Sequence, residues 1–233
     1  MLLVILADNS KTMENTAPIQ HREPEEKARI KNAFIQHVLE TGHEPASVFK
    51  FAQTLNLRQE EFFQYYNSFK SIKSEVWDQI FDQTLAVMYA QEVYPSYAAQ
   101  EKLLSFYFTW IEELKKNRSY FLSLYEHQAG FAKVLPSEVM SFKRKFKAFA
   151  KEIVHEGKAT GEIVDRKFFS DGYEEGMWAE TMFIFQFWLR DTSPGFEKTD
   201  AAIEKSVALA FDLIGRNAID SLLDFAKFLY QSR

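Results

Sequence analysis

The sequence predicts an all-α fold, in which a small three-helix unit precedes a larger helical bundle. Apolar residues recur at the three- and four-residue spacing of helices along most of the chain, and no run alternates with the period of two that a strand requires. Only 8 glycines and 6 prolines interrupt the 233 residues. The helices are therefore expected to be long.

The composition is that of a globular protein with an aromatic-rich core. Hydrophobic residues make up 46% of the chain and charged residues 26%, and 23 Phe, 10 Tyr and 4 Trp give an aromatic share of 16%. Large rigid rings fill wide spaces between helices and can line apolar pockets. Because the sequence has no cysteine, it forms no disulfide, no thiolate zinc site and no cysteine nucleophile.

Three short helices are predicted near the N-terminus, after a mobile polar tail over residues 1–24. The first, at 25–41, places Ile30, Phe34 and Val38 on one face, and Gly42 ends it as a C-cap residue. The second and third are expected at 46–55 and 59–66. A compact unit of this size is typical of a helix-turn-helix domain, which we assign to residues 25–70.

The helical bundle is expected to span residues 71–233. Its predicted helices cover 69–93, 97–117, 120–133, 137–156, 171–191, 198–215 and 218–231. Proline and glycine mark the breaks between them, at 95, 136, 157–161 and 193–195.

A pattern of apolar, small and aromatic residues runs without a gap from Arg29 to Ile72. Its members are Ile30, Ala33-Phe34, His37-Val38, Gly42, Ser47-Val48, Phe51-Ala52 and Phe63-Gln64-Tyr65-Tyr66-Asn67-Ser68-Phe69, followed by Lys70. This pattern resembles the helix-turn-helix of the TetR/AcrR family of transcriptional repressors. The rest of the chain is similar to the family's ligand and dimer domain in length and helix number only. The resemblance implies a TetR-like homodimer that binds operator DNA and responds to a ligand. Within this picture, the helices at 171–191 and 198–215 are our candidates for the isologous dimer interface.

In a repressor of this kind, phosphate contacts position the helix-turn-helix and base contacts make it specific. The resemblance assigns the DNA contacts to Ser47, Arg58, Gln59, Gln64, Tyr65 and Lys70. Among these, glutamine and arginine side chains are expected to read bases.

The surface expected to meet DNA departs from the family pattern. Glu60 and Glu61 stand where the family favours small residues, and Phe63 replaces a phosphate-contacting tyrosine. Phe69 stands in place of the family's lysine, with Lys70 displaced by one position. Between positions 22 and 75 the sequence has eight basic and eight acidic residues, and the whole chain has a net charge of −5. This region is therefore expected to neutralise little of the phosphate charge of DNA. The alternative is a TetR-fold protein that no longer binds DNA and instead binds an apolar ligand or a lipid.

Aromatic residues of the bundle form a candidate pocket for a small apolar or aromatic ligand. The helix at 171–191 is apolar nearly all round, which implies burial on several sides, and it carries Glu180, a carboxylate that needs a partner. The candidate ligand contacts are Tyr107, Trp110, Phe121, Tyr125, Trp178, Glu180, Met182 and Phe185. An ordinary core position is the alternative for each of them, and a salt bridge is the alternative for Glu180.

The remaining charged patterns indicate no catalytic or metal chemistry. A basic run from Lys143 to Lys151 is interpreted as a solvated helix face, with an anionic partner or a membrane surface as the alternative. Of two Glu-x-x-His pairs, the one ending at His43 straddles a helix end and the one ending at His155 points away from the core, so no metal site is expected.

Neither enzymatic activity nor a cofactor is expected, because no catalytic or nucleotide-binding motif occurs. No segment reaches the ~18 apolar residues of a membrane span, and the N-terminus lacks the basic region of a signal peptide. We therefore expect a cytoplasmic protein.

Overall fold

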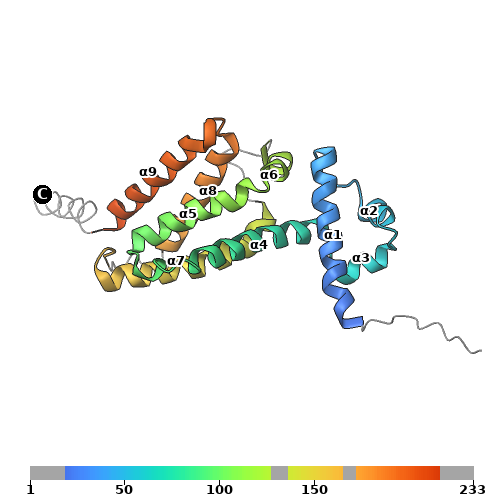
Figure 1. Ribbon diagram of the computed structural model, residues 1–233, viewed down its shortest axis with the longest axis horizontal. Coiled ribbons are helices and arrows are strands. Elements are labelled where there is room, and N and C mark those ends of the chain that lie inside the picture. Colours follow the sequence, from blue (N-terminus) through green and yellow to red (C-terminus); the bar gives the residue numbers. More distant parts are fainter. Residues whose placement is uncertain (1–18, 127–135, 165–171, 216–233) are drawn as a thin grey trace, which may run out of the picture.

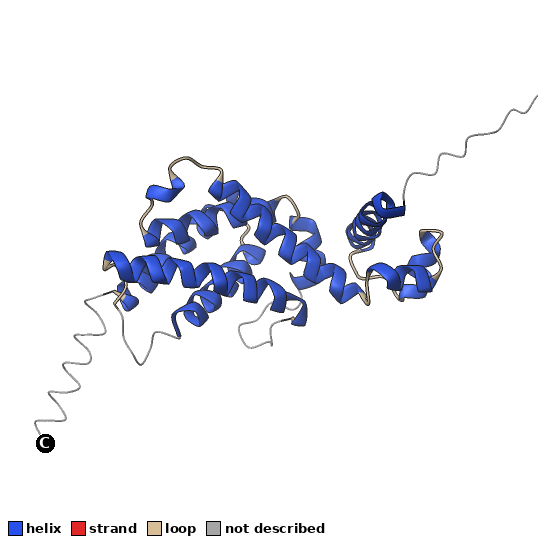
Figure 2. Cartoon of the chain, turned by 90° about the horizontal axis from the view of Figure 1, so that it is seen from below, coloured by secondary structure: helices blue, strands red, loops and turns tan. Residues whose placement is uncertain are grey.

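The computed structural model describes residues 19–126, 136–164 and 172–215, and within these ranges the chain folds into helices without strands (Figure 2). The predicted tail lies outside the described residues up to position 18, and residues 19–24 belong to the first helix. The predicted helix at 218–231 also lies outside them.

Helices α1 (Ile19–Thr41), α2 (Val48–Thr54) and α3 (Gln59–Tyr65) form the N-terminal unit, which we call the head. Figure 1 shows the head at one end of the molecule, with α2 and α3 on the side of α1 that faces away from the remaining helices. Its core consists of side chains that are at most 3% exposed, namely Ile30, Phe34, Val38, Phe51, Ala52 and Phe62.

The long helix α4 (Phe69–Tyr89) begins inside the head and continues into the rest of the molecule (Figure 1). The ring of Phe69 stacks on that of Phe34, with centroids 5.3 Å apart, and meets the ring of Phe51 edge-on at 5.4 Å. Phe69 therefore packs in the head core, and its replacement of a DNA-facing lysine has a structural reason.

The remaining helices form the body. They are η1 (Tyr94–Ser96), α5 (Ala99–Lys115), α6 (Arg118–Tyr125), η3 (Ser137–Val139), α7 (Met140–Thr160), α8 (Tyr173–Arg190), η5 (Pro194–Phe196) and α9 (Glu197–Ile214). Helix α4 packs against α5 and α7, while α8 lies between α7 and α9. The head meets the body where α1 contacts α6 and the first turns of α4.

The break predicted at 157–161 begins too early, because α7 continues through Gly157 to Thr160. Gly157 is buried, and a Cβ atom there would lie only 2.7 Å from Cδ1 of Ile163 and 3.1 Å from Cβ of Ala99. The missing side chain thus lets the following loop pass close to the helix. The helix ends at Gly161, which adopts the left-handed conformation with φ of 82°.

Candidate functional site

Helices α2 and α3 pack together as a helix-turn-helix. The hydroxyl of Ser47 caps α2 by accepting a hydrogen bond from the backbone N–H of Lys50 (3.2 Å). The chain reverses at Asn56, which has a φ of 55°. Glu60, Phe63 and Gln64 of α3 are exposed, so this helix presents a free face to the solvent.

The six predicted DNA contacts lie on α2, α3 and the first turn of α4. Arg58 and Gln64 are exposed, Ser47, Gln59 and Tyr65 are half-buried, and Lys70 is exposed. The guanidinium Nε of Arg58 lies 3.4 Å from Glu61 Oε2. Of the six, Gln64 is exposed on α3, and the contacts of all six with DNA stay a prediction.

Glu61 has a structural role that the sequence reasoning missed. Its carboxylate accepts a hydrogen bond of 2.7 Å from the backbone N–H of Arg58, at the start of α3. This backbone bond, with the side-chain bond to Arg58, lowers the pKa of Glu61. A carboxylate at the third helical position, three residues after the N-cap, was the available signal. Of the two glutamates, only Glu60 remains a free anion on α3.

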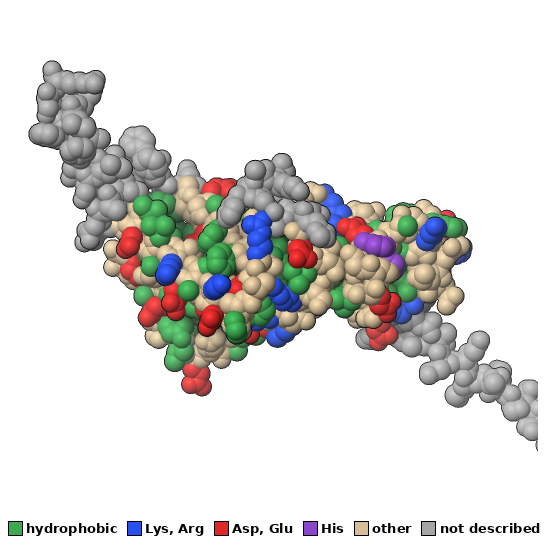
Figure 3. All heavy atoms as spheres, turned by 90° about the horizontal axis from the view of Figure 1, so that it is seen from above, with side chains coloured by type: hydrophobic (Ala, Val, Ile, Leu, Met, Phe, Trp, Pro, Cys, Tyr) green, Lys and Arg blue, Asp and Glu red, His purple; other side chains and the backbone are tan. Residues whose placement is uncertain are grey.

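Several cations of the head are engaged by neighbouring carboxylates. Arg29 pairs with Glu26, Lys27 and Lys31 pair with Glu75, and Lys73 pairs with Glu44 and Glu138. Among the described side chains of the head and the first turn of α4, Lys50 and Lys70 are exposed cations that make no ion pair. The face in Figure 3 shows basic and acidic side chains interspersed along head and body.

The basic run on α7 is largely paired within the body. Lys143 and Lys147 both bind Glu175 at 2.8 Å, and Lys145 binds Asp82 at 2.7 Å. These pairs favour a solvated, internally neutralised face over a surface for an anionic partner.

Seven of the eight predicted ligand contacts lie in the interior of the body. Tyr107, Trp110, Phe121, Tyr125, Trp178, Met182 and Phe185 are at most 7% exposed. The ring of Phe185 lies centrally, with centroid distances of 4.9 Å to Trp77, 5.8 Å to Phe121 and 6.0 Å to Tyr125. A ligand must displace rings to enter this cluster, so the packing agrees with the core interpretation. Trp77 is a central member that the sequence reasoning did not select.

An open apolar groove of about 680 Å³ runs between α8 and α9. Gly176 and Phe183 line it on α8, and Leu209 and Leu213 line it on α9. Of the eight predicted ligand contacts, Glu180 alone lines this groove. The sequence reasoning selected both helices as an interface and did not select these groove residues.

Glu180 is a carboxylate in apolar surroundings. The hydroxyl of Tyr107 lies 3.4 Å from Glu180 Oε2, and Oε1 is buried without a hydrogen-bond partner among the described residues. Burial raises the pKa of Glu180 to about 7, although hydrogen bonds from Ser206 and Tyr107 oppose the rise. The groove therefore contains a carboxyl group that titrates near neutral pH.

Comparison with known proteins settles the family. The model of the tetracyclin repressor-like C-terminal domain matches residues 102–229, which is more than half of the chain. The chain belongs to the TetR family of transcriptional regulators. This family consists of regulators rather than enzymes. No curated protein matches the sequence.

Solved structures of transcriptional regulators share the fold across most of this chain. A TetR regulator from Nitrosomonas europaea is 12% identical, with a TM-score of 0.56 over 79% of this chain and 97% of that one. A tetR-family protein from Rhodococcus RHA1 is 16% identical, with a TM-score of 0.52 over 82% and 98% of the two chains. A transcriptional regulator from Cytophaga hutchinsonii is 14% identical, with a TM-score of 0.52 over 82% and 99%.

None of the described helices has the length and hydropathy needed to cross a bilayer. The described residues also bring no three metal-binding side chains of the His, Cys, Asp or Glu type together.

Proposed function

We propose that this TetR-family chain is a ligand-responsive repressor that binds operator DNA as a homodimer. The observation that carries the proposal is the free face of α3, which bears the exposed Gln64. This helix lies on the side of α1 that faces away from the body (Figure 1). Lys50 and Lys70, the exposed unpaired cations, flank this helix in sequence on α2 and α4. A recognition helix of this kind enters the major groove and is positioned by phosphate contacts on either side.

Base reading is assigned to the glutamines of α3. A glutamine amide makes a bidentate contact with the N6 and N7 atoms of adenine, and Arg58 can contact the O6 and N7 atoms of guanine once it leaves Glu61. Glu60 can only accept hydrogen bonds, from the N4 amino group of cytosine or the N6 amino group of adenine. The head is therefore expected to prefer sites that contain adenine opposite α3.

Dimerisation is assigned to the groove between α8 and α9. Leu209 and Leu213 are 59% and 45% exposed there, although both are large apolar side chains. A second copy, related by a two-fold axis, would place the same apolar face against this one and remove both from water. Two heads would then face successive major grooves about one helical turn apart.

The ligand response is assigned to the aromatic interior of the body. An apolar or aromatic molecule that enters the cluster around Phe185 must rearrange its rings. Such a ligand favours one spacing of the two heads over another, and this difference is what changes DNA affinity.

The test is a selection of random-sequence duplexes by the purified full-length protein at low salt. We expect a palindromic site with half-sites about 10 base pairs apart or a multiple of it. Gln64→Ala should relax the preference at one position per half-site, by about 1–3 kcal/mol, whereas Gln100→Ala on α5 should leave the selected site unchanged. Native mass spectrometry of the same preparation reports a retained ligand. Failure to enrich any sequence would leave the DNA-free binding protein as the function.

A further inference from the structure

The first turns of α4 hold a cation between the head and the body. The ammonium of Lys73 lies 2.7 Å from Glu44 Oε1, in the connection between α1 and α2, and 2.8 Å from Glu138 Oε1, in η3. The side chains of Lys73 and Glu138 are 13% and 8% exposed, and that of Glu44 is 38% exposed. One buried ammonium thus joins a head carboxylate to a body carboxylate.

The contact favours the charged forms of Lys73 and Glu138. Burial opposes the charge of Lys73, but its hydrogen bonds to Glu138 and Glu44 outweigh burial and raise its pKa. Burial likewise opposes the charge of Glu138, and the bond from Lys73 outweighs it and lowers the pKa of Glu138. Removing either carboxylate therefore weakens a real ionic contact across the head–body junction.

The body end of this contact continues into the aromatic interior. The hydroxyl of Tyr125 donates to Glu138 Oε1 (3.2 Å) and accepts a hydrogen bond from Nε1 of Trp77 (3.1 Å). The ring of Tyr125 packs against that of Phe185, with centroids 6.0 Å apart. A displacement of these rings therefore moves the Tyr125 hydroxyl that donates a hydrogen bond to Glu138.

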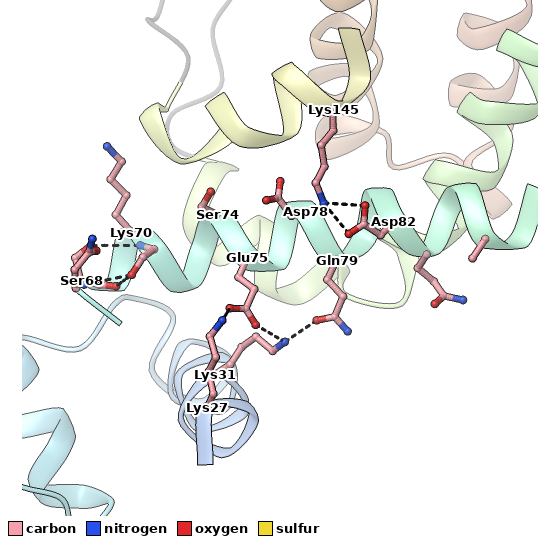
Figure 4. A pocket seen from close by; sticks show the side chains of 14 residues that line it. Lys27, Lys31, Ser68, Lys70, Ser74, Glu75, Asp78, Gln79, Asp82 and Lys145 are labelled. Atoms are coloured by element: carbon pink, nitrogen blue, oxygen red, sulfur yellow. Dashed lines mark hydrogen bonds and ion pairs between the residues drawn. The ribbon is translucent and has the colours of Figure 1, made fainter. Parts of the chain in front are cut away.

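On another side of α4, Glu75 ties the helix to α1. Figure 4 shows Lys27 and Lys31 of α1 pointing at the Glu75 carboxylate, which they reach at 2.7 and 2.9 Å. Glu75 and Lys73 are two residues apart, which separates them by about 200° around the helix. Glu75 joins α4 to α1, which belongs to the head. Lys73 instead joins the connection between α1 and α2 to η3, and so links the head to the body.

We propose that Lys73 is a positioning residue, which fixes the orientation of the head relative to the body by holding Glu44 and Glu138 together. One consequence of this proposal rests on the proposed repressor function. A ligand that displaces Tyr125 releases Glu138, and the orientation of the head relative to the body is then no longer fixed. A freed head samples many orientations, and a DNA site with fixed half-site spacing selects only a few of them.

The test measures the head–body distance within one chain. Because the sequence has no cysteine, cysteines introduced at Gln53 of α2 and Ala148 of α7, both exposed, carry two spin labels at defined places. Labelled chain is mixed with excess unlabelled chain, so the distance distribution from pulsed electron resonance is intramolecular whether or not the protein dimerises.

The informative variant is Glu44→Gln, because this half-exposed residue can change without unfolding the protein. Its matched control is Glu175→Gln, since Glu175 also binds two lysines, Lys143 and Lys147, but entirely within the body. We expect Glu44→Gln to broaden the distance distribution and to weaken binding to the selected duplex about tenfold. Glu175→Gln should change neither, and Lys73→Arg, which keeps the charge, should retain the narrow distribution.

A distribution for Glu44→Gln as narrow as that of the parent protein would overturn the inference. So would an equal broadening in Glu175→Gln. If no duplex binds the parent protein, the proposed repressor function fails, while the distance measurement still decides whether Lys73 orients the head.

Discussion

Replacing Lys70 with glutamine should make DNA binding less sensitive to salt. Figure 4 shows the Lys70 side chain extending away from the carboxylates of α4, and the residue makes no ion pair among the described residues. Among the described side chains, Lys50 and Lys70 provide two free cations per head, and hence about four phosphate contacts in a dimer. Each contact contributes a slope of about −0.9 to the logarithm of affinity against the logarithm of salt, so the parent slope is about −3.6. Arg58 is omitted because Glu61 engages it.

Lys70→Gln removes two of these contacts and leaves a slope of about −1.8. Between 50 and 200 mM salt, the parent protein should lose about 150-fold in affinity and the variant about 12-fold. Fluorescence anisotropy with a labelled duplex measures both slopes. Lys151→Gln on α7 is the matched control, because Lys151 is also exposed and has no ion pair among the described residues. Equal slopes for Lys70→Gln and the parent would refute the assignment of Lys70 to a phosphate.

Three further predictions concern the body. Glu180 keeps its proton up to about pH 7 in the folded protein but releases it near pH 4.5 in the unfolded chain. The free energy of unfolding should therefore fall by up to about 3 kcal/mol as pH rises through this window. Chemical denaturation at several pH values should show this fall in the parent protein and not in Glu180→Gln. Phe185→Ala should lower the free energy of unfolding by about 3–5 kcal/mol. Phe49→Ala should lower it little, because Phe49 of α2 is 54% exposed. Similar urea midpoints for the two variants would contradict the packing argument. Leu209→Glu should convert a dimer to monomers in sedimentation, whereas Val87→Glu, at an exposed apolar site of α4, should not; a dimeric Leu209→Glu would exclude this face as the interface.

Local patterns predicted most of the helices because their signals lie within a few residues of one another. The core positions Ile30, Phe34 and Val38 follow the helical period, and each is fully buried. The hydroxyl of Ser47 and the left-handed Gly161 mark helix ends by their own chemistry. Gly157 was misread, because a glycine inside a helix looks the same whether it breaks the helix or accommodates a neighbour.

The candidate site was harder to predict than the helices. Aromatic residues selected for a ligand pocket lie in the core, since a sequence does not tell whether rings leave a space between them or fill it. Glu61 was interpreted as an anion facing DNA, although its carboxylate turns back to the N–H of Arg58. Glu180 was selected as a carboxylate needing a partner, and the structure places it in the groove between α8 and α9.

The sequence alone predicts an all-helical protein, because the period of apolar residues and the helix caps are local properties, and its pattern from Arg29 to Ile72 resembles a TetR helix-turn-helix. Only the tertiary structure decided that Lys73 lies between Glu44 and Glu138, that Phe69 enters the head core, and that Leu209 of α9 is exposed beside an apolar groove. These features join residues far apart in the chain. Their distances depend on how whole helices pack against each other, which no short stretch of sequence specifies.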